Sequence, residues 1–359
     1  MSTIAAISTA PGNAGIGIIR LSGDDCFKIL QKIFKPKNKG EIKGYTIKYG
    51  NIVKSKNGEI IDEVLVSYFV APKSYTKENM CEINSHGGMV VENQILEECL
   101  KNGAVLAEPG EFTKRAFMNG RIDLSQAEAV IDVINSKTEK EMIVAQRHLE
   151  GSLSKKIKDI QREILNLMAD IEASIDYPEY DIEETTNNKI KDTLNSVEEK
   201  LLKLKNSFEN GKILKEGIKT AIVGKPNVGK SSLLNLILGE NRAIVSDIEG
   251  TTRDTIEEYI NIKGIPLKIV DTAGIRKTND EIEKIGVKRS INNISDAELI
   301  IALFDDSRAF DEQDQKILDL IEGKKTIILI NKVDLGKNLI KENEKIKKLE
   351  NDVIEFSTI

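Results

Sequence analysis

Tryptophan is absent from this 359-residue chain, and aromatic residues together make up 4% of it. With so few rings to stack on bases, the composition argues against a platform for single-stranded nucleic acid. The net charge is −6, so no global basic field attracts nucleic acid, which leaves room only for a local basic patch.

Cysteine and long apolar runs are scarce as well. Cys26, Cys81 and Cys99 are too few and too widely spaced to predict a zinc site. Their odd number and the absence of a signal peptide indicate a reducing cytoplasm, and no apolar stretch is long enough to span a bilayer. With 40% hydrophobic residues, a chain of this length predicts two or three domains with sizeable cores.

What the chain does contain is the glycine-rich motif Gly224-Lys-Pro-Asn-Val-Gly-Lys-Ser231. It lies between an apolar run at 218–223 and an apolar helical segment at 231–238, which Gly239 is expected to end. Strand, loop and helix in this order predict a phosphate-binding loop, in which backbone N–H groups and the helix N-terminus face phosphate oxygens. Lys230 is expected to bridge the β- and γ-phosphates, and Ser231 to bind Mg²⁺.

Two further motifs follow apolar runs farther along the chain. Asp271-Thr-Ala-Gly274 follows the run at 267–270, so that Asp271 is expected near Mg²⁺ and the Gly274 amide at the γ-phosphate. Asn331-Lys-Val-Asp334 follows the run at 326–330. A buried Asp334 carboxylate accepts from the N1–H and the amine of guanine, a donor pair that adenine lacks, so the motif predicts GTP rather than ATP.

The segment Gly250-Thr-Thr-Arg-Asp254 lies where a nucleotide-sensing switch is expected, and Thr251 or Thr252 would complete the Mg²⁺ shell. After Gly274 the chain has Ile275, at the position where Ras-like enzymes carry a water-positioning Gln. Hydrolysis therefore needs another device, and the nearby carboxylates are Asp280, Glu281 and Glu283.

Patterning predicts three domains: an α+β domain over residues 1–118, an α-helical domain over 119–214 and a P-loop α/β domain with a doubly wound, mainly parallel sheet over 215–359. In the first domain we expect strands at 46–53, 60–70 and 80–84 and a helix at 90–101. In the second, Ser125–Glu128 reads as a capping box. Apolar stripes on the helices that follow read as bundle core, separated by a polar linker at 179–188, with a further helix at 194–208. A last strand is expected at 353–357.

Four segments carry a specific resemblance, and they are Pro11–Gly23, Glu82–Gly88, Pro109–Phe117 and Leu124–Ala129. Together with the nucleotide motifs placed after the helical segment, they resemble the MnmE/TrmE family of tRNA modification GTPases over essentially the whole chain. Members of this family act with an FAD-dependent partner of the MnmG/GidA type, in a hetero-oligomer, on the wobble uridine-34 of tRNA. The resemblance implies a 5-(carboxymethyl)aminomethyl modification in the cytoplasm without a membrane.

The family's N-terminal domain forms the homodimer and binds a one-carbon donor, 5-formyl- or methylene-tetrahydrofolate. The resemblance assigns its contacts to Arg20, Glu82 and Arg121, and the family most often has Lys at the last position. Arginine suits carboxylates and glutamate suits the amino face of a pterin. His86 reads as a turn histidine beside two glycines rather than a catalytic one, because no paired carboxylate is evident in the sequence.

The family also implies how hydrolysis proceeds without the Gln: a K⁺ ion takes the place of an arginine finger. Asn227 matches the K⁺-ligating Asn, with backbone oxygens of Ser246, Ile248 and Thr251 completing the shell. Thr252 then binds Mg²⁺ with Ser231, Glu283 orients water, and Lys230 and Asn227 stabilise the charge that develops. On its own, Asn227 could instead cap the loop.

The full set of GTP contacts that the resemblance implies spans all motifs: Asn227, Val228, Gly229, Lys230, Ser231, Ser232, Ser246, Asp247, Ile248, Glu249, Gly250, Thr251, Thr252, Asp271, Thr272, Ala273, Gly274, Asn331, Lys332, Asp334 and Ser357. The family continues with further helices and a Cys-x-Gly-Lys motif that this sequence does not contain, so we expect a chain truncated at its C-terminus, and a chain that binds GTP without modifying tRNA stays open. Two alternatives stay open: a GTP-gated binding switch of the ribosome-assembly type, and an inactive fragment that keeps only N-terminal dimerisation.

Overall fold

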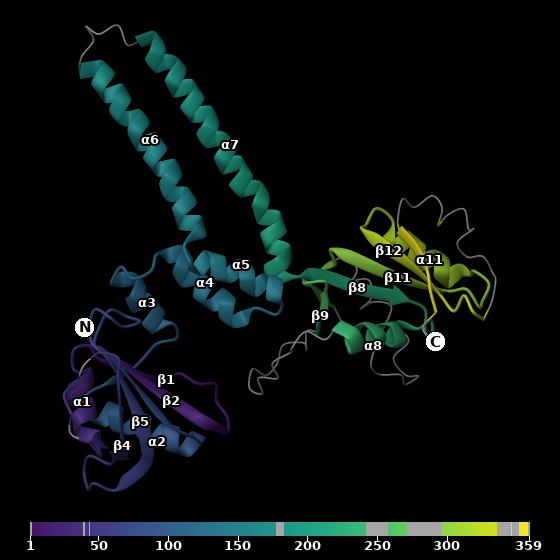
Figure 1. The fold of residues 1–359 in the computed structure, drawn as a ribbon. Coiled ribbons are helices and arrows are strands. Elements are labelled where there is room, and N and C mark those ends of the chain that lie inside the picture. The colour runs from purple at the N-terminus through teal and green to yellow at the C-terminus, as the bar shows by residue number, and fades with distance from the viewer. Residues whose placement is uncertain are drawn as a thin grey trace. The chain divides into compact units, whose positions relative to one another are not determined.

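The computed structural model of the chain describes residues 2–38, 40–42, 44–176, 183–241, 258–270, 296–335, 346 and 352–357. The chain divides into two compact units (Figure 1). One consists of Met1–Ile131 and His148–Ser154, and the other of Asp132–Arg147 and Lys155–Ile359. The division into three domains at 118 and 214 stays a prediction.

The first unit is built on a seven-stranded sheet in the order β3-β4-β5-β6-β2-β1-β7. Its strands are β1 (Ile4–Ile7), β2 (Ala14–Ser22), β3 (Phe34–Pro36), β4 (Thr46–Val53), β5 (Ile60–Phe69), β6 (Met80–Gly87) and β7 (Val105–Leu106). All neighbours pair antiparallel except β1 and β7. The predicted β4–β5 hairpin is confirmed, and β6 is longer than expected because its end pairs with Ala14 of β2.

Helices α1 (Cys26–Ile33) and α2 (Met89–Lys101) pack on one face of this sheet. Alternation along β5 explains why: Val64, Val66 and Tyr68 are buried in the core, whereas Leu65 between them is exposed on the other face. The helix expected at 90–101 is therefore confirmed as α2, and Leu65 shows that part of the opposite face of the sheet is exposed.

Helices α3 (Glu111–Met118) and α4 (Leu124–Asn135) follow. The capping box expected at Ser125–Glu128 is wrong, because the helix begins earlier. The Asp123 carboxylate accepts from the Gln126 backbone N–H at 3.0 Å, and the Gln126 side chain accepts from the Asp123 N–H at 3.0 Å. Asp123 is thus the capping residue, and Ser125 donates to its carboxylate at 2.8 Å.

Helices α5 (Glu139–Leu149), α6 (Ser152–Asp176) and α7 (Glu183–Glu216) complete the helical part, and Figure 1 shows α6 and α7 side by side. Because α7 begins at Glu183, the polar linker expected at 179–188 is wrong from that residue on, and 179–182 lie outside the described residues. The apolar stripes are only partly core. Ile160 and Leu167, two turns apart, are buried together with Val197, whereas Ile157, Ile164 and Met168 stay exposed. Two paired helices bury one narrow stripe.

The nucleotide part of the second unit holds a sheet in the order β13-β12-β11-β8-β10-β9. Its strands are β8 (Ile218–Gly224), β9 (Glu258–Ile262), β10 (Ile265–Ile269), β11 (Leu299–Asp305), β12 (Thr326–Asn331) and β13 (Asp352–Glu355). All pairs are parallel except the edge pair β9–β10. The predicted, mainly parallel sheet is confirmed, although its last strand begins and ends earlier than expected.

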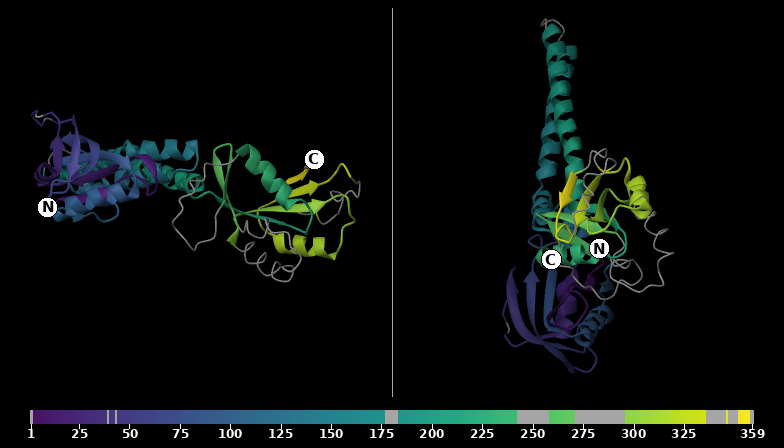
Figure 2. Two further views of the ribbon diagram at one scale, coloured as in Figure 1. Left: turned by 90° about the horizontal axis from the view of Figure 1, so that it is seen from below. Right: turned by 90° about the vertical axis from the view of Figure 1, so that its right-hand side faces the viewer.

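Helices α8 (Lys230–Asn241) and α11 (Glu312–Ile321) cover opposite faces of this sheet, as Figure 2 shows for the green and yellow-green helices. Alternate residues of β8 point to opposite sides: Val223 packs into the core beneath α11, and Ile222 into the core beneath α8. This is the doubly wound arrangement. Gly239 lies inside α8 rather than ending it, at a cost that a helix tolerates. Within the described residues no helix is long and apolar enough to cross a bilayer.

Candidate functional site

The phosphate loop joins the carboxyl end of β8 to the N-terminus of α8, and two of its residues must be glycine. Gly224 has φ +157°, and a Cβ there would lie 2.7 Å from the Leu303 carbonyl oxygen. Gly229 has φ +106°, and a Cβ there would clash with Nδ2 of Asn331. The loop is therefore shaped by close contact with two neighbouring strands.

Lys230 opens α8 and points back across the loop. Its Nζ donates to the carbonyl oxygens of Gly224 at 2.6 Å and Lys225 at 2.7 Å. Burial lowers the pKa of Lys230 to about 8. Ser231 is half-buried and Ser232 exposed in the same first turn. The helix N-terminus and this amine together form a cradle suited to phosphate oxygens.

The predicted base-reading motif lies against the phosphate loop. Buried Asn331 donates from Nδ2 to the Val228 carbonyl oxygen at 2.9 Å. Lys332 donates to the Asn227 carbonyl oxygen at 2.9 Å and to the Asp305 carboxylate at 2.8 Å. The structure thus brings together two motifs that lie about a hundred residues apart in the sequence.

Asp334 differs from its expectation: a buried carboxylate is predicted, but the residue is exposed. Its carboxylate therefore contacts solvent instead of other protein groups. The expected discrimination against ATP then requires that the bound base itself shields the carboxylate from water. Ser357 is half-buried directly after β13, the strand next to β12.

Sequence reasoning missed a set of ion pairs beneath the loop. Lys225, in the loop itself, is paired with Asp311 at 3.0 Å and Asp314 at 2.7 Å. The two aspartates form a capping box at the start of α11, and their i, i+3 spacing was the signal that could have revealed it. Burial opposes the charge of Lys225, but the hydrogen bonds that it donates to both carboxylates outweigh this effect and raise its pKa.

The remaining nucleotide residues lie outside the described part of the chain: Ser246, Asp247, Ile248, Glu249, Gly250, Thr251, Thr252, Asp271, Thr272, Ala273, Gly274 and Glu283. Asn227 is described. It is exposed, and its φ of 61° places it in the left-handed region. Its side-chain amide has no hydrogen bond to the described residues, so its oxygen is available to a cation.

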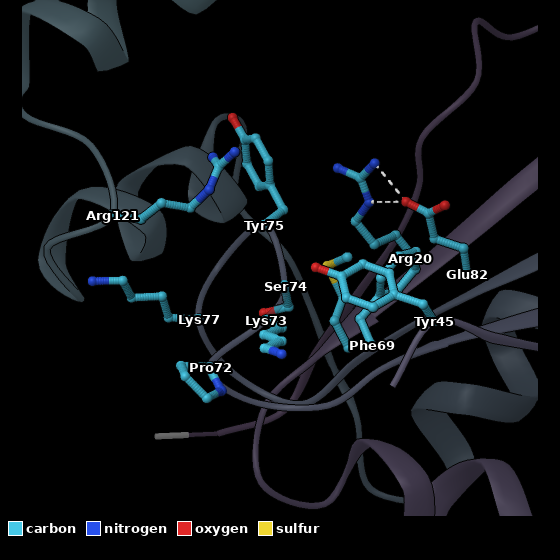
Figure 3. A pocket seen from close by; sticks show the side chains of 11 residues that line it. Arg20, Tyr45, Phe69, Pro72, Lys73, Ser74, Tyr75, Lys77, Glu82 and Arg121 are labelled. Carbon is cyan, nitrogen blue, oxygen red and sulfur yellow. Dashed lines mark hydrogen bonds and ion pairs between the residues drawn. The ribbon is translucent and has the colours of Figure 1, made fainter. Parts of the chain in front are cut away.

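The first unit contains a cavity of about 410 Å³ (Figure 3), and the three residues predicted to bind folate all line it. Arg20 lies on β2 directly opposite Glu82 on β6. The guanidinium donates to the Glu82 carboxylate through Nε at 2.9 Å and through Nη2 at 2.7 Å. Arg121, just after α3, stacks its guanidinium 4.6 Å from the ring centre of Tyr75. The structure therefore brings Arg20, Glu82 and Arg121 to one cavity.

Several lining residues carried no sequence signal. They are Tyr45, Phe69, Pro72, Lys73, Ser74, Tyr75, Lys77 and Met80. The rings of Tyr45, Phe69 and Tyr75 suit a flat heterocycle, and the Glu82 carboxylate suits its amino and imino donors. These side chains fit a pterin in chemical kind.

A buried polar network supports the segment that carries Tyr75. Arg115 on α3 is 5% exposed and pairs with Glu78 at 3.2 Å and Glu111 at 2.8 Å. Glu78 also accepts from the Ser22 hydroxyl at 2.7 Å. Burial alone would raise the pKa of Glu111, but the Glu108 N–H and Arg115 outweigh it, so that its pKa is lowered. The network fixes the cavity wall to β2 and α3.

The interpretation of His86 as an unpaired turn residue is wrong in one respect. Its Nδ1 lies 2.8 Å from the Asp62 carboxylate, whose other oxygen accepts from the His86 backbone N–H at 2.8 Å. The pairing arises because β5 and β6 are neighbours, which spacing in the sequence does not reveal. The imidazole remains exposed at the end of β6.

Two family models match the chain: the N-terminus of GTP-binding protein TrmE over residues 3–121, and the MnmE helical domain over residues 124–359. The tRNA modification GTPase MnmE of Acetivibrio thermocellus is 57% identical over 334 residues, or 93% of this chain and 73% of that protein. The protein of that name from Clostridioides difficile is 56% identical over 355 residues, or 98% of this chain and 77% of its own.

The chain belongs to the MnmE family of tRNA modification GTPases.

The predicted family and fold class are thereby confirmed, and the chain is a P-loop GTPase. A crystal structure of Era with MgGDPNP and nucleotides of 16S ribosomal RNA is 31% identical over 39% of this chain and 51% of that chain, with a TM-score of 0.30.

Proposed function

We propose that this MnmE-family chain hydrolyses GTP and takes part in 5-(carboxymethyl)aminomethyl modification of uridine-34 of tRNA. It acts as a cytoplasmic homodimer, formed through the N-terminal domain, with an FAD-dependent partner of the MnmG type and a tetrahydrofolate one-carbon donor. The observation that carries the proposal is that one chain has both a phosphate loop joined to a base-reading motif and a separate cavity with folate-compatible side chains.

At the nucleotide site, Lys230 would leave the loop carbonyls to contact the β- and γ-phosphates, and Asn331 and Lys332 would hold the loop for it. Ser231 and Thr252 would hold Mg²⁺, which when bound compensates the phosphate charge. Asn227, with backbone oxygens of Ser246, Ile248 and Thr251, would hold K⁺. The Asn227 amide is exposed and has no hydrogen-bond partner in the part of the chain that the structure describes, which supports this ligand role, and Glu283 would orient the water.

At the cavity, Glu82 would accept from the donors of the pterin ring, and Arg121 would bind a carboxylate of the glutamate. Arg20 already has the Glu82 carboxylate as its partner, so its role is to orient Glu82 rather than to take the ligand's carboxylate alone. The tetrahydrofolate supplies the one-carbon unit, and these residues bind and orient it.

The test measures GTP turnover in K⁺ and in Na⁺ for wild type, Asn227→Ala and the control Asn188→Ala, which changes an exposed residue of α7. We expect K⁺ to stimulate wild type and the control strongly, up to about 10³-fold if the ion replaces an arginine finger, and Asn227→Ala to lose the stimulation. Equal turnover in both salts would contradict the K⁺ mechanism. In parallel, 5-formyl-tetrahydrofolate is titrated by calorimetry, and no binding would leave a GTP-gated switch as the better description.

A further inference from the structure

The cavity of the first unit has two chemically different sides. Figure 3 shows the Arg20–Glu82 pair on one side of Tyr75, and Arg121 and Lys77 on the other. The pair is charge-compensated at 2.7 Å. Among the described lining residues, Glu82 is the one carboxylate, and it is already paired with Arg20. The other lining cations, Lys73, Lys77 and Arg121, therefore have no lining carboxylate left to pair with. The cavity therefore has a compensated end and a basic end.

The three cations of the basic end keep their charges uncompensated within the described residues. Lys77 donates to the carbonyl oxygens of Asn119 at 3.1 Å and Gly120 at 2.8 Å, which are neutral acceptors. Arg121 lies against the Tyr75 ring. Lys73 is exposed, and its amine contacts none of the described carboxylates.

Elsewhere in this unit lysines commonly have acidic partners. The pairs are Lys28–Asp25, Lys37–Glu63, Lys54–Glu59, Lys101–Glu97 and Lys114–Glu108. Lys32, Lys35, Lys48 and Lys56 also have no acidic partner among the described residues. Lys73, Lys77 and Arg121 differ from them because all three line one cavity, and this arrangement suits an anionic ligand of more than one charge.

We propose that the basic end binds the poly-γ-glutamate tail of a folate, and that Lys73 selects the polyglutamylated form. This inference rests on the proposed folate site. With the pterin ring at Glu82, the first glutamate reaches Arg121 and Lys77. Each further γ-linked glutamate adds one carboxylate, and the chain leaves the cavity past Lys73, the exposed cation of the rim.

The exposure of these charges sets how strongly each carboxylate of the tail contributes to binding. Contacts between exposed charges contribute little each, so every additional carboxylate is expected to tighten binding by about two- to fivefold. Such contacts are screened by salt, because the Debye length is about 10 Å at 0.1 M. The preference for the polyglutamate should therefore shrink as salt rises, while binding of the ring persists.

The test compares 5-formyl-tetrahydrofolate with its triglutamate by calorimetry on the whole chain. The readout is the ratio of the two Kd values for wild type, Lys73→Gln and the control Lys56→Gln, an exposed lysine in the β4–β5 turn. Because the triglutamate carries two additional carboxylates, we expect it to bind about four- to 25-fold tighter at low salt, the ratio to fall towards one in Lys73→Gln, and the control to behave as wild type.

Three results would overturn the inference. Equal Kd values for both ligands in wild type would remove the tail site and leave the folate proposal standing. Binding of neither ligand would remove the folate proposal and the tail site with it. A Lys73→Gln variant that keeps the triglutamate preference but binds tRNA more weakly would show that the rim contacts phosphates instead.

Discussion

The side-chain amide of Asn331, at the end of β12, donates to the carbonyl oxygen of Val228 in the phosphate loop at 2.9 Å. Both residues are buried, at 0% and 1% exposure. This hydrogen bond makes the loop's shape depend on the strand that carries the predicted base-reading motif. A change at either end should therefore affect both phosphate and guanine binding.

The variant Asn331→Ala removes this donor and leaves the Val228 carbonyl without its partner. We expect a loss of about 1–3 kcal/mol in the free energy of unfolding, because an unsatisfied buried acceptor retains its desolvation penalty. The affinity for GTP should fall by about tenfold or more. Urea unfolding and titration of a fluorescent GTP analogue measure the two effects. Asn188→Ala on α7 is the control, and wild-type GTP affinity in Asn331→Ala would contradict the coupling.

The variant Asp334→Asn tests the base contact. A carboxylate accepts from two guanine donors, whereas an amide offers one acceptor and one donor, which suits xanthine. We expect GTP affinity to fall on the order of 10²-fold and xanthosine triphosphate to become the preferred ligand. Because Asp334 is exposed, stability should stay as in wild type. Competition between the two nucleotides measures the preference, and unchanged GTP affinity would refute the role.

Elements with strong local signals were predictable from the sequence. The β4–β5 hairpin follows from alternation around an Asn-Gly turn, and the phosphate loop follows from glycines that only its geometry needs. Predictions failed where a local pattern had competitors. Both Asp123 and Ser125 are residue types that can cap α4. Which of them does so depends on the residue at which the preceding turn ends and the helix begins.

Contacts between distant segments left no trace in the sequence. His86 meets Asp62 only because β5 and β6 are neighbours, and Lys225 meets Asp314 only because α11 packs beside the loop. The cavity follows the same rule: Arg20 and Glu82 were found through a family resemblance, whereas Tyr75 and Lys77 depend on how one loop crosses the sheet.

The pair Lys225–Asp314 should couple strongly, because the side chains are only 11% and 3% exposed. Lys225→Met leaves a buried carboxylate without its cation, and we expect a loss of about 3–5 kcal/mol in unfolding free energy. The double variant Lys225→Met, Asp314→Asn removes that charge as well and should be less destabilised than the sum of the singles. Chemical unfolding of all four proteins completes the cycle, and strict additivity would show that the pair is not coupled.

The Asp305 carboxylate should make stability depend on pH. Burial alone would raise its pKa, but hydrogen bonds from Lys332 and Ser307 outweigh it and lower the pKa below 3.8. A carboxylate whose pKa is lower in the folded than in the unfolded state stabilises the fold at pH values above its unfolded-state pKa. This contribution is lost as the pH falls through its folded-state pKa. The free energy of unfolding of wild type should thus exceed that of Asp305→Asn by about 1.5–3 kcal/mol at pH 7, and this difference should disappear below about pH 4. Urea unfolding across this range checks the sign, and a gap that widens in acid would contradict it.

Arg115 should determine whether the cavity wall keeps its shape. Its guanidinium is buried between Glu78 and Glu111, so Arg115→Ala leaves two carboxylates short of their cation, at a cost of about 3–5 kcal/mol. Lysine at this position keeps the positive charge but lacks the planar guanidinium, whose several N–H donors reach both carboxylates. Arg115→Lys should therefore recover only part of the lost unfolding free energy. The neighbouring Lys114 is exposed and meets Glu108 at 4.0 Å, so Lys114→Ala should change stability by less than about 0.5 kcal/mol. Thermal unfolding of the three variants makes the comparison, and similar losses for Arg115→Ala and Lys114→Ala would show that the buried network does not support the wall.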